Sequence, residues 1–287
     1  MKGKDVQNDL IKGTYGIYQP VLTDDNTWTL HSPLYKENCH STSGALQETL
    51  YNYVEGTQVL KKLKKQTSLS IFELGLGTGL GFRATIEEVK KFLKREKGKT
   101  ETINFVSSEI DEKLAFHFLK LLLEEKFIED VVLTNNQSGL RYFKSSFTIK
   151  EKFMELKGQL IVLTGNVSET FPRYQSLYPI KFDCFYHDPF NPKKNAILWT
   201  TEFFEMMKMA ACEKSVLSTY SSTKAVWKAL IKAGWKVCEV KGYGKKKLST
   251  RAYIVGESSE FVIDQCSRSP SPALSDTLLP EGLNPFL

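Results

Sequence analysis

Four glycines within seven residues, Gly75, Gly77, Gly79 and Gly81, constrain the fold of this chain more than any other feature. The apolar run before them, residues 70–74, has the pattern of a buried strand, and the amphipathic residues 80–97 have the period of a helix. Glycines at this spacing let the backbone turn sharply and approach a ligand closely. The segment therefore predicts a strand, a ligand-binding loop and a helix at the start of an α/β sheet.

From residue 68 onward, strand and helix patterns alternate. The predicted strands are 69–74, 103–108, 159–163, 182–187, 215–219, 236–240 and 252–255, and helices are predicted at 80–97, 111–125, 199–211 and 223–233. Such alternation is typical of a mostly parallel sheet covered by helices on both faces. The last two strands must form an antiparallel hairpin, since residues 242–251 are too few for a helical crossover. A seven-stranded, mostly parallel sheet with this terminal hairpin resembles the Rossmann-like fold of class I methyltransferases that use S-adenosyl-L-methionine (SAM).

Three parts of the chain are expected to differ in organisation. Residues 1–66 form an N-terminal extension, with short strands at 14–18 and 28–31 and a helix at 46–65. Residues 67–256 form the methyltransferase domain. Residues 257–287 contain a Ser/Pro-rich stretch that cannot build a core, so we expect an extended or mobile tail.

Composition excludes several classes of protein. No apolar stretch approaches the roughly 20 residues that span a bilayer, and no apolar segment follows the N-terminus as in a secretory signal. The five cysteines contain no CxxC pair and the four histidines have no metal-ligand spacing. We therefore expect reduced thiols, a cytoplasmic location, no membrane and no metal. The formal net charge of +6 is a mild preference for anionic partners.

The glycine loop leaves three interpretations open. A phosphate loop of the Walker type needs Gly-Lys-Ser/Thr, which Gly81-Phe82 does not supply. A dinucleotide loop, as in a nicotinamide oxidoreductase, needs G-x-G-x-x-G, whereas this loop reads G-x-G-x-G. A tight turn without a ligand is the third. Glu73, directly before the loop, would disfavour a pyrophosphate but suits the positively charged end of SAM.

Polar residues at the ends of the next two strands suit a nucleoside. Glu109 can accept hydrogen bonds from both ribose hydroxyls, whereas Asp111 is a natural helix N-cap. Asn166, after Gly165, lies where an adenine base would bind, although an Asn after Gly is equally typical of a turn.

The fourth predicted strand runs into Asp188-Pro189-Phe190-Asn191-Pro192. This segment is either a proline-stiffened turn or a loop in which Asp188 holds an amine. A carboxylate there could orient a methyl-acceptor nitrogen and take its proton.

Several segments in the same order resemble one family, the tRNA wobble-uridine methyltransferases found as half of bifunctional MnmC and as stand-alone MnmD proteins. The matching stretches are His40-Ser41 with Gly44 and Glu48, Glu73 to Leu80, His187 to Asn195 with Trp199-Thr200, Leu217 to Tyr220, Val226 with Gly234-Trp235, and Gly242 to Lys246. The resemblance implies methyl transfer from SAM to the aminomethyl nitrogen on carbon 5 of the wobble uridine. It also implies site residues. Those for the cofactor are Glu48, Glu73, Gly75, Gly77, Thr78, Gly79, Glu109, Asn166 and Asp188, and those for the substrate or RNA are Asp188, Pro189, Phe190, Lys193, Lys194, Tyr243, Lys245, Lys246 and Lys247.

The sequence departs from the family pattern in three places. Asn166 stands where Asp is usual, Pro189 where Gly is usual, and Lys245 to Leu248 where Arg-Lys-Arg-Glu is usual. No second glycine-rich nucleotide loop is present, so the resemblance implies methylation alone, with other enzymes installing the aminomethyl group. An amino-methyltransferase for DNA, protein or a small molecule stays an alternative, as does a non-catalytic protein that binds SAM and RNA.

Overall fold

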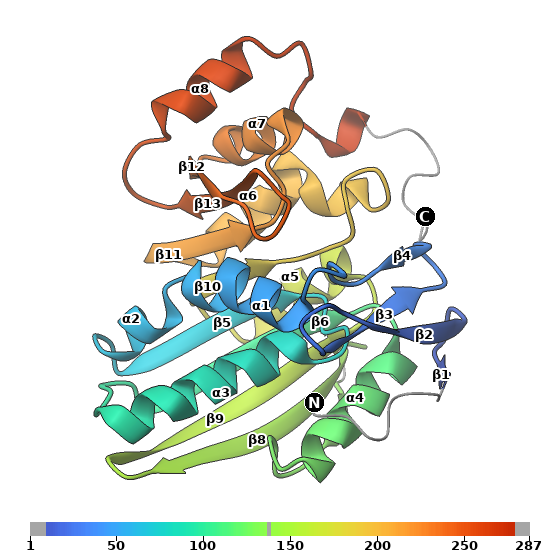
Figure 1. Ribbon diagram of the computed structural model, residues 1–287, viewed down its shortest axis with the longest axis vertical. Coiled ribbons are helices and arrows are strands. Elements are labelled where there is room, and N and C mark those ends of the chain that lie inside the picture. Colours follow the sequence, from blue (N-terminus) through green and yellow to red (C-terminus); the bar gives the residue numbers. More distant parts are fainter. Residues whose placement is uncertain (1–9, 137–138, 279–287) are drawn as a thin grey trace.

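A nine-stranded mixed sheet forms the centre of the computed structural model, which describes residues 10–136 and 139–278. The strand order is β12-β13-β11-β10-β5-β6-β9-β8-β7. The strands are β5 (Ser68–Leu74), β6 (Thr102–Glu109), β7 (Val132–Asn135), β8 (Arg141–Glu151), β9 (Met154–Thr164), β10 (Phe182–His187), β11 (Ala211–Thr219), β12 (Lys236–Lys241) and β13 (Leu248–Tyr253). The five strands from β9 to β11 run parallel, and both edges of the sheet are antiparallel (Figure 1).

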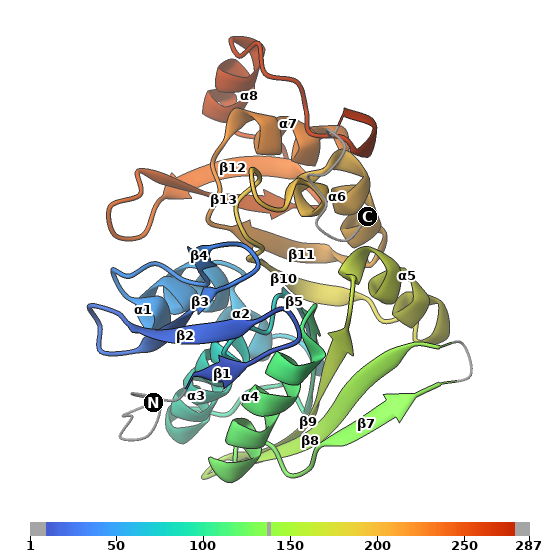
Figure 2. The same cartoon turned by 90° about the vertical axis from the view of Figure 1, so that its right-hand side faces the viewer.

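The seven strands predicted from the sequence are all present, but the prediction of only seven is wrong. A long strand, β8, pairs antiparallel with β9, and β7 pairs with β8 beyond it (Figure 2). The signal for β8 was in the sequence, because buried residues alternate from Phe143 to Ile149. The polar residues Lys144 and Ser146 between them made this half-buried edge hard to distinguish from a loop.

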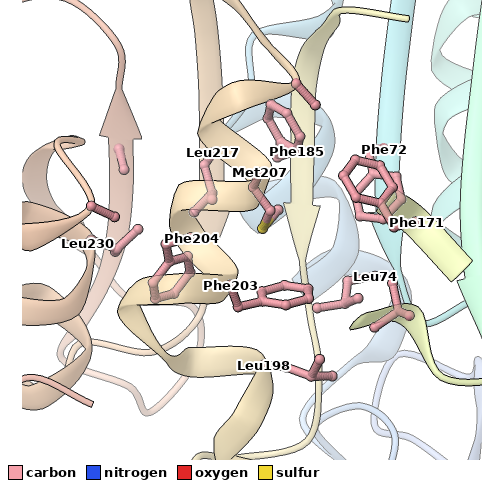
Figure 3. Packing of buried hydrophobic residues seen from close by; sticks show 14 of the residues in the cluster. Phe72, Leu74, Phe171, Phe185, Leu198, Phe203, Phe204, Met207, Leu217 and Leu230 are labelled. Atoms are coloured by element: carbon pink, nitrogen blue, oxygen red, sulfur yellow. The ribbon is translucent and has the colours of Figure 1, made fainter. Parts of the chain in front are cut away.

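Helices cover both faces of the sheet. They are α3 (Leu80–Arg95), α4 (Glu112–Glu124), α5 (Val167–Leu177), α6 (Thr201–Met209), α7 (Lys224–Lys232) and α8 (Glu260–Ser267), with the short α1 (Ala45–Thr49) and α2 (Val59–Leu63), and 3-10 turns at Ala196–Trp199 and Asp276–Leu278. Helices α2, α3 and α4 pack on one face, and α5, α6 and α7 on the other. Figure 3 shows Phe72 of β5 beside Phe171 of α5, whose ring centroids are 4.3 Å apart. Residues 69–74 of β5 are all buried, as expected for a central parallel strand.

The N-terminal residues build a small antiparallel sheet, β1 (Ile11–Lys12), β2 (Ile17–Leu22), β3 (Trp28–Ser32) and β4 (Glu37–Asn38). Its apolar face packs on α4, where Tyr18 and Leu30 contact Leu114 and Phe118. The small sheet thus lies beside the start of α4, next to the carboxyl ends of β5 and β6 (Figure 1). Its position matters because ligands of such sheets bind at that edge.

Two other expectations are wrong in part. In place of the single helix predicted at 46–65, α1 continues into a π-helical turn (Leu50–Glu55), and the left-handed backbone of Gln58 (φ 64°) separates that turn from α2. The tail expected to be extended contains α8, whose Val262 side chain is fully buried. Two backbone carbonyls after α8, of Ser269 and Ser271, accept hydrogen bonds from Lys228 Nζ. The end of this tail, residues 279–287, lies outside the described residues. Within the described chain, no helix combines the length and apolarity needed to cross a bilayer.

Candidate active site

A cavity of about 510 Å³ opens at the carboxyl edge of the central sheet. Its walls come from the segments after β5, β6, β9, β10 and β11 and from the N-terminal residues 32–48. The chain order reverses here, since β6 continues from β5 on one side and β10 lies on the other. Of the residues predicted from the sequence, those that line the cavity are Glu48, Gly75, Gly77, Glu109, Asn166, Asp188, Pro189, Phe190 and Lys246.

The glycine loop forms one wall of this cavity. Gly77 has a left-handed backbone (φ 52°), and a Cβ atom there would meet no atom within 4 Å, so the space above it is open. The loop is tied to β6 by a hydrogen bond from Leu76 N–H to the Ser108 carbonyl (2.8 Å). Thr78, predicted as a cofactor residue, is buried, and its hydroxyl has no hydrogen-bond partner within the described part of the chain. Gly79 lies outside the cavity wall and begins α3 as its N-cap.

Glu73 does not line the cavity. Its side chain lies behind the loop, where the Ser107 hydroxyl donates a hydrogen bond to Oε2 (2.7 Å). Burial raises the pKa of the Glu73 carboxyl to about 8. A Cβ atom on Gly81 would clash with Glu73 Oε1, so the last glycine of the loop is needed to make room for this carboxyl group. Glu73 and Gly81 therefore pack against each other, and neither lines the cavity.

Glu109 lies at the wall, at the end of β6. Its two oxygens accept hydrogen bonds from Gly77 N–H (3.0 Å) and Asp111 N–H (3.0 Å). Burial raises its pKa to about 7, and these backbone donors oppose the rise. The prediction that Asp111 caps the following helix is confirmed, because its carboxylate accepts from Lys113 N–H and Leu114 N–H. Glu109, unlike Asp111, is therefore a carboxylate that lines the cavity.

Both interpretations of Asn166 have support. Its side-chain oxygen accepts from Ser168 N–H (3.1 Å) and caps α5, which is the turn-like role. The residue also lines the cavity. Because an amide oxygen has two lone pairs, capping leaves one acceptor site for a ligand.

Asp188 directly follows β10 and lines the cavity. Its side chain is partly exposed to the cavity and otherwise enclosed by protein, and this burial raises the pKa of the carboxyl to about 8. The negative charge of Glu48 adds to the rise, while the Tyr53 hydroxyl and the Lys246 ammonium oppose it. The loop glycine Gly75 is close by, since its Cβ position is 3.9 Å from the Asp188 carbonyl oxygen. Asp188 and the glycine loop are thus adjacent, because they follow the neighbouring strands β10 and β5.

The loop that contains Asp188 is held by aromatic residues that sequence reasoning missed. Tyr35, from the small sheet's last turn, stacks on Phe190 with ring centroids 4.1 Å apart. The Asn195 amide donates a hydrogen bond to the Tyr35 hydroxyl (3.2 Å), and the Tyr220 hydroxyl donates one to the Pro189 carbonyl (2.9 Å). Tyr220 stands inside a stretch that carried the family resemblance, whereas nothing in the sequence around Tyr35 marked it.

The predicted RNA-contacting residues have different surroundings. Lys193 and Lys194 are exposed on the loop after Asp188, and Lys245 and Lys247 are exposed in the turn between β12 and β13. Lys246, in the same turn, reaches into the cavity wall instead, where its Nζ is 2.9 Å from Glu48 Oε1.

Tyr243 lies outside the cavity wall. Its ring centroid is 6.2 Å from that of Tyr51, and its hydroxyl is 2.9 Å from the Cβ position of Gly44. The predicted substrate residue Tyr243 therefore docks the turn on the segment that begins α1.

The donor set fits SAM better than a metal. An open glycine backbone, a buried carboxylate and an amide match a nucleoside, and the unpartnered Thr78 hydroxyl is a further buried donor beside the loop. Among the described residues, no cluster of three His, Cys, Asp or Glu side chains could hold a metal ion.

Comparisons with known proteins agree with this geometry. Residues 136–254 match a family model described as S-adenosyl-L-methionine-dependent methyltransferase. The bifunctional tRNA 5-methylaminomethyl-2-thiouridine biosynthesis protein MnmC of Burkholderia thailandensis is 28% identical over 236 residues, which is 80% of this chain and 33% of that protein. MnmC of Burkholderia multivorans is 29% identical over 230 residues, with the same two shares. The chain therefore spans about a third of the length of these curated relatives.

One solved structure, MNMC2 from Aquifex aeolicus, superposes with a TM-score of 0.67 at 23% sequence identity. The match covers 93% of this chain and 81% of that one. Such a likeness establishes the α/β fold. The family match establishes SAM as the cofactor of the family to which this sequence is similar.

Proposed function

We propose that this chain, a SAM-dependent methyltransferase that resembles the methyltransferase part of MnmC proteins, modifies the wobble uridine of tRNA. The reaction would convert 5-aminomethyl-(2-thio)uridine into 5-methylaminomethyl-(2-thio)uridine. The observation that carries the proposal is the position of Asp188: a carboxylate with a raised pKa shares one cavity with the glycine loop and Glu109. The MnmC relatives, which are named for tRNA 5-methylaminomethyl-2-thiouridine biosynthesis, support the choice of substrate.

The cofactor would lie along the glycine loop. Glu109 would accept hydrogen bonds from the ribose hydroxyls and Asn166 would contact the base, a proposal supported by the position of both residues in the cavity lining. The open space above Gly77 admits the ligand close to the backbone. When bound, SAM supplies a methyl carbon attached to a positively charged sulfur.

Asp188 would orient the acceptor amine and handle its proton. An aminomethyl group is an ammonium ion at neutral pH and must lose a proton before its nitrogen has a free lone pair. A carboxylate whose pKa is near 8 is a stronger base than an ordinary aspartate, so it can accept that proton. The nitrogen would then form a bond to the methyl carbon as the carbon–sulfur bond breaks and its electron pair returns to sulfur. The product would leave as the methylated ammonium ion, since Asp188 already holds the first proton.

The lysines outside the cavity would bind RNA phosphates. Lys193 and Lys194 lie on the exposed loop next to Asp188, and Lys245 and Lys247 on the turn beside it. Such contacts position RNA without reading its sequence, and they weaken as salt rises. The substrate must come from enzymes that install an aminomethyl group, and we place the reaction in the cytoplasm, where tRNA is modified.

Nucleoside analysis of tRNA tests the proposal directly in cells. Deletion of the gene should cause 5-aminomethyl uridine to accumulate at the expense of the methylated form. The wild-type gene should restore the methylated nucleoside, whereas the Asp188→Asn variant should not. Unchanged levels of both nucleosides in the deletion strain would contradict the proposal and favour DNA, protein or a small molecule as the acceptor. Full restoration by Asp188→Asn would contradict the catalytic role of Asp188.

A further inference from the structure

Lys246 occupies an unusual position among the basic residues of its turn. Its Nζ forms an ion pair with Glu48 Oε1 (2.9 Å) and lies 4.2 Å from the centroid of the Tyr220 ring. Both partners line the cavity, as does Asp188. The Lys246 side chain is 41% exposed, while that of Glu48 is 8% exposed. The lysine therefore reaches from the surface into a site whose acidic partner is buried.

These two partners, with Asp188 in the same cavity wall, have the chemistry of a binding site for a primary ammonium ion. A buried carboxylate provides a charge-assisted hydrogen bond, and the face of an aromatic ring attracts a cation. Asp188 contributes a second carboxylate to the cavity wall. The positive charge of Lys246 lowers the pKa of the Asp188 carboxyl, against the effect of burial. Glu48 is independently fixed, because Ser41 N–H donates a hydrogen bond to its other oxygen, Oε2 (2.9 Å). The carboxylate would thus stay in place if the lysine left.

We propose that Glu48, Tyr220 and Asp188 form the subsite for the substrate's aminomethyl group, and that the Lys246 ammonium fills this subsite until substrate displaces it. The inference rests on the proposed function for the identity of the amine. It assigns Glu48 to the acceptor amine, whereas the family resemblance had implied contact with the cofactor. It also separates Lys246 from Lys245 and Lys247, which stay at the surface.

Displacement needs only a side-chain movement. The turn's backbone is held by hydrogen bonds from Gly242 N–H to the Lys247 carbonyl (3.0 Å) and from Lys246 N–H to the Tyr243 carbonyl (3.1 Å). The long, half-exposed lysine side chain can swing toward solvent, where RNA phosphates would compensate its charge. A free nucleoside has no phosphates to compensate the charge of the displaced Lys246 side chain. The full free-energy cost of displacing Lys246 therefore weakens the binding of the nucleoside. If Lys246 fills the subsite about 90% of the time, the apparent affinity for a free aminomethyl nucleoside is about tenfold weaker than the intrinsic affinity.

Calorimetric titration of the full chain, saturated with S-adenosylhomocysteine to prevent turnover, tests this inference. The probes are 5-aminomethyluridine and uridine, titrated into the wild type, Lys246→Met and Lys246→Gln. Lys150→Met is the matched control, since Lys150 is 74% exposed and pairs with Glu155 away from the cavity. We expect both Lys246 variants to bind 5-aminomethyluridine about tenfold more tightly than the wild type and the control do. Binding of uridine, which has no amine, should be equal in all four proteins.

Equal or weaker binding of 5-aminomethyluridine by both folded Lys246 variants would overturn the inference. The paired neutral variants and a thermal melt of each protein guard against a folding defect in one of them. Failure of the proposed function is distinguishable, because it is measured separately as methyl transfer from SAM to tRNA. If that transfer is absent but the Lys246 variants still bind the amine more tightly, the subsite stands and the assigned tRNA substrate is wrong. If transfer occurs and amine binding does not respond, the enzyme stands and the subsite is wrong.

Discussion

Replacing Asp188 by Asn should stabilise the protein while it abolishes most catalysis. The Asp188 carboxyl is enclosed at the cavity wall, and burial raises its pKa from the ordinary 3.8 to about 8. Folding at pH 7.5 must therefore either bury a charge or take up a proton. An asparagine of the same shape avoids both costs. Removing a general base should lower the methyl-transfer rate by about 10²–10⁴-fold.

The stability gain follows from the two pKa values. The distance from 3.8 to pH 7.5 is about 3.7 pH units, and at about 1.36 kcal/mol per unit the upper bound is about 5 kcal/mol. Water in the cavity screens the partly exposed carboxylate, so we expect about 2 kcal/mol at pH 7.5. Because the folded pKa is higher than the unfolded one, protonation favours the folded state. The wild type's relative stability is therefore fully present below about pH 3.8 and is lost as the pH rises toward about 8.

Urea denaturation of the ligand-free proteins at several pH values measures this effect. The stability difference between Asp188→Asn and the wild type should be near zero at about pH 4 and grow up to about pH 8. Asp264→Asn is the matched control, since Asp264 forms an exposed ion pair with Arg268 (2.7 Å) and should change stability by less than about 1 kcal/mol. A difference that does not vary with pH, or a variant less stable than the wild type at pH 8, would refute the reasoning.

The sequence predicts the elements whose patterns are local. The central strand β5 is mostly apolar and is buried from Leu69 to Leu74, and Asp111 precedes a helical pattern, so both were identified correctly. The divided helix at 46–65 was not, because only the folded chain shows the left-handed backbone of Gln58. Helix α8 was missed because its buried stripe is narrow, with Val262 and Cys266 as its buried residues.

The same distinction applies to the site. Gly77, Glu109 and Asp188 follow strand-like runs directly, and the carboxyl ends of parallel strands meet at one edge, so their convergence was predictable. The hydrogen bond between Tyr35 and Asn195 joins residues 160 positions apart, and no local pattern announces it. Glu73 was assigned to the ligand because it adjoins the loop, yet strand alternation directs its side chain behind the loop toward Ser107.

Three further predictions follow from individual contacts. Gly81→Ala should destabilise the protein by about 1–3 kcal/mol and weaken SAM binding, because the new methyl group would displace the Glu73 carboxyl. Denaturation and SAM titration measure the two effects, and wild-type values in both would contradict the role of Gly81 in making room for Glu73. Tyr35→Ala should raise KM for tRNA by roughly 3- to 10-fold at constant SAM affinity, since it removes the ring stacked on Phe190. An unchanged KM would show that Tyr35 does not position the loop that contains Asp188. The Lys193→Ala/Lys194→Ala double variant should reduce the slope of log Kd for tRNA against the logarithm of the salt concentration by about 1–2. A slope equal to that of the wild type would show that these lysines do not contact phosphates.

Methyl transfer in a purified system tests the central claim most directly. The protein is incubated with isotopically labelled SAM and a tRNA that carries 5-aminomethyluridine at the wobble position. A parallel reaction contains the same tRNA with an unmodified uridine at that position. The tRNAs are then digested, and the nucleosides are identified by mass spectrometry. The account predicts labelled 5-methylaminomethyluridine from the first tRNA alone, and its near absence when Asp188→Asn replaces the wild type. Label in another nucleoside, label from the unmodified tRNA, or no label from the aminomethyl tRNA would contradict it.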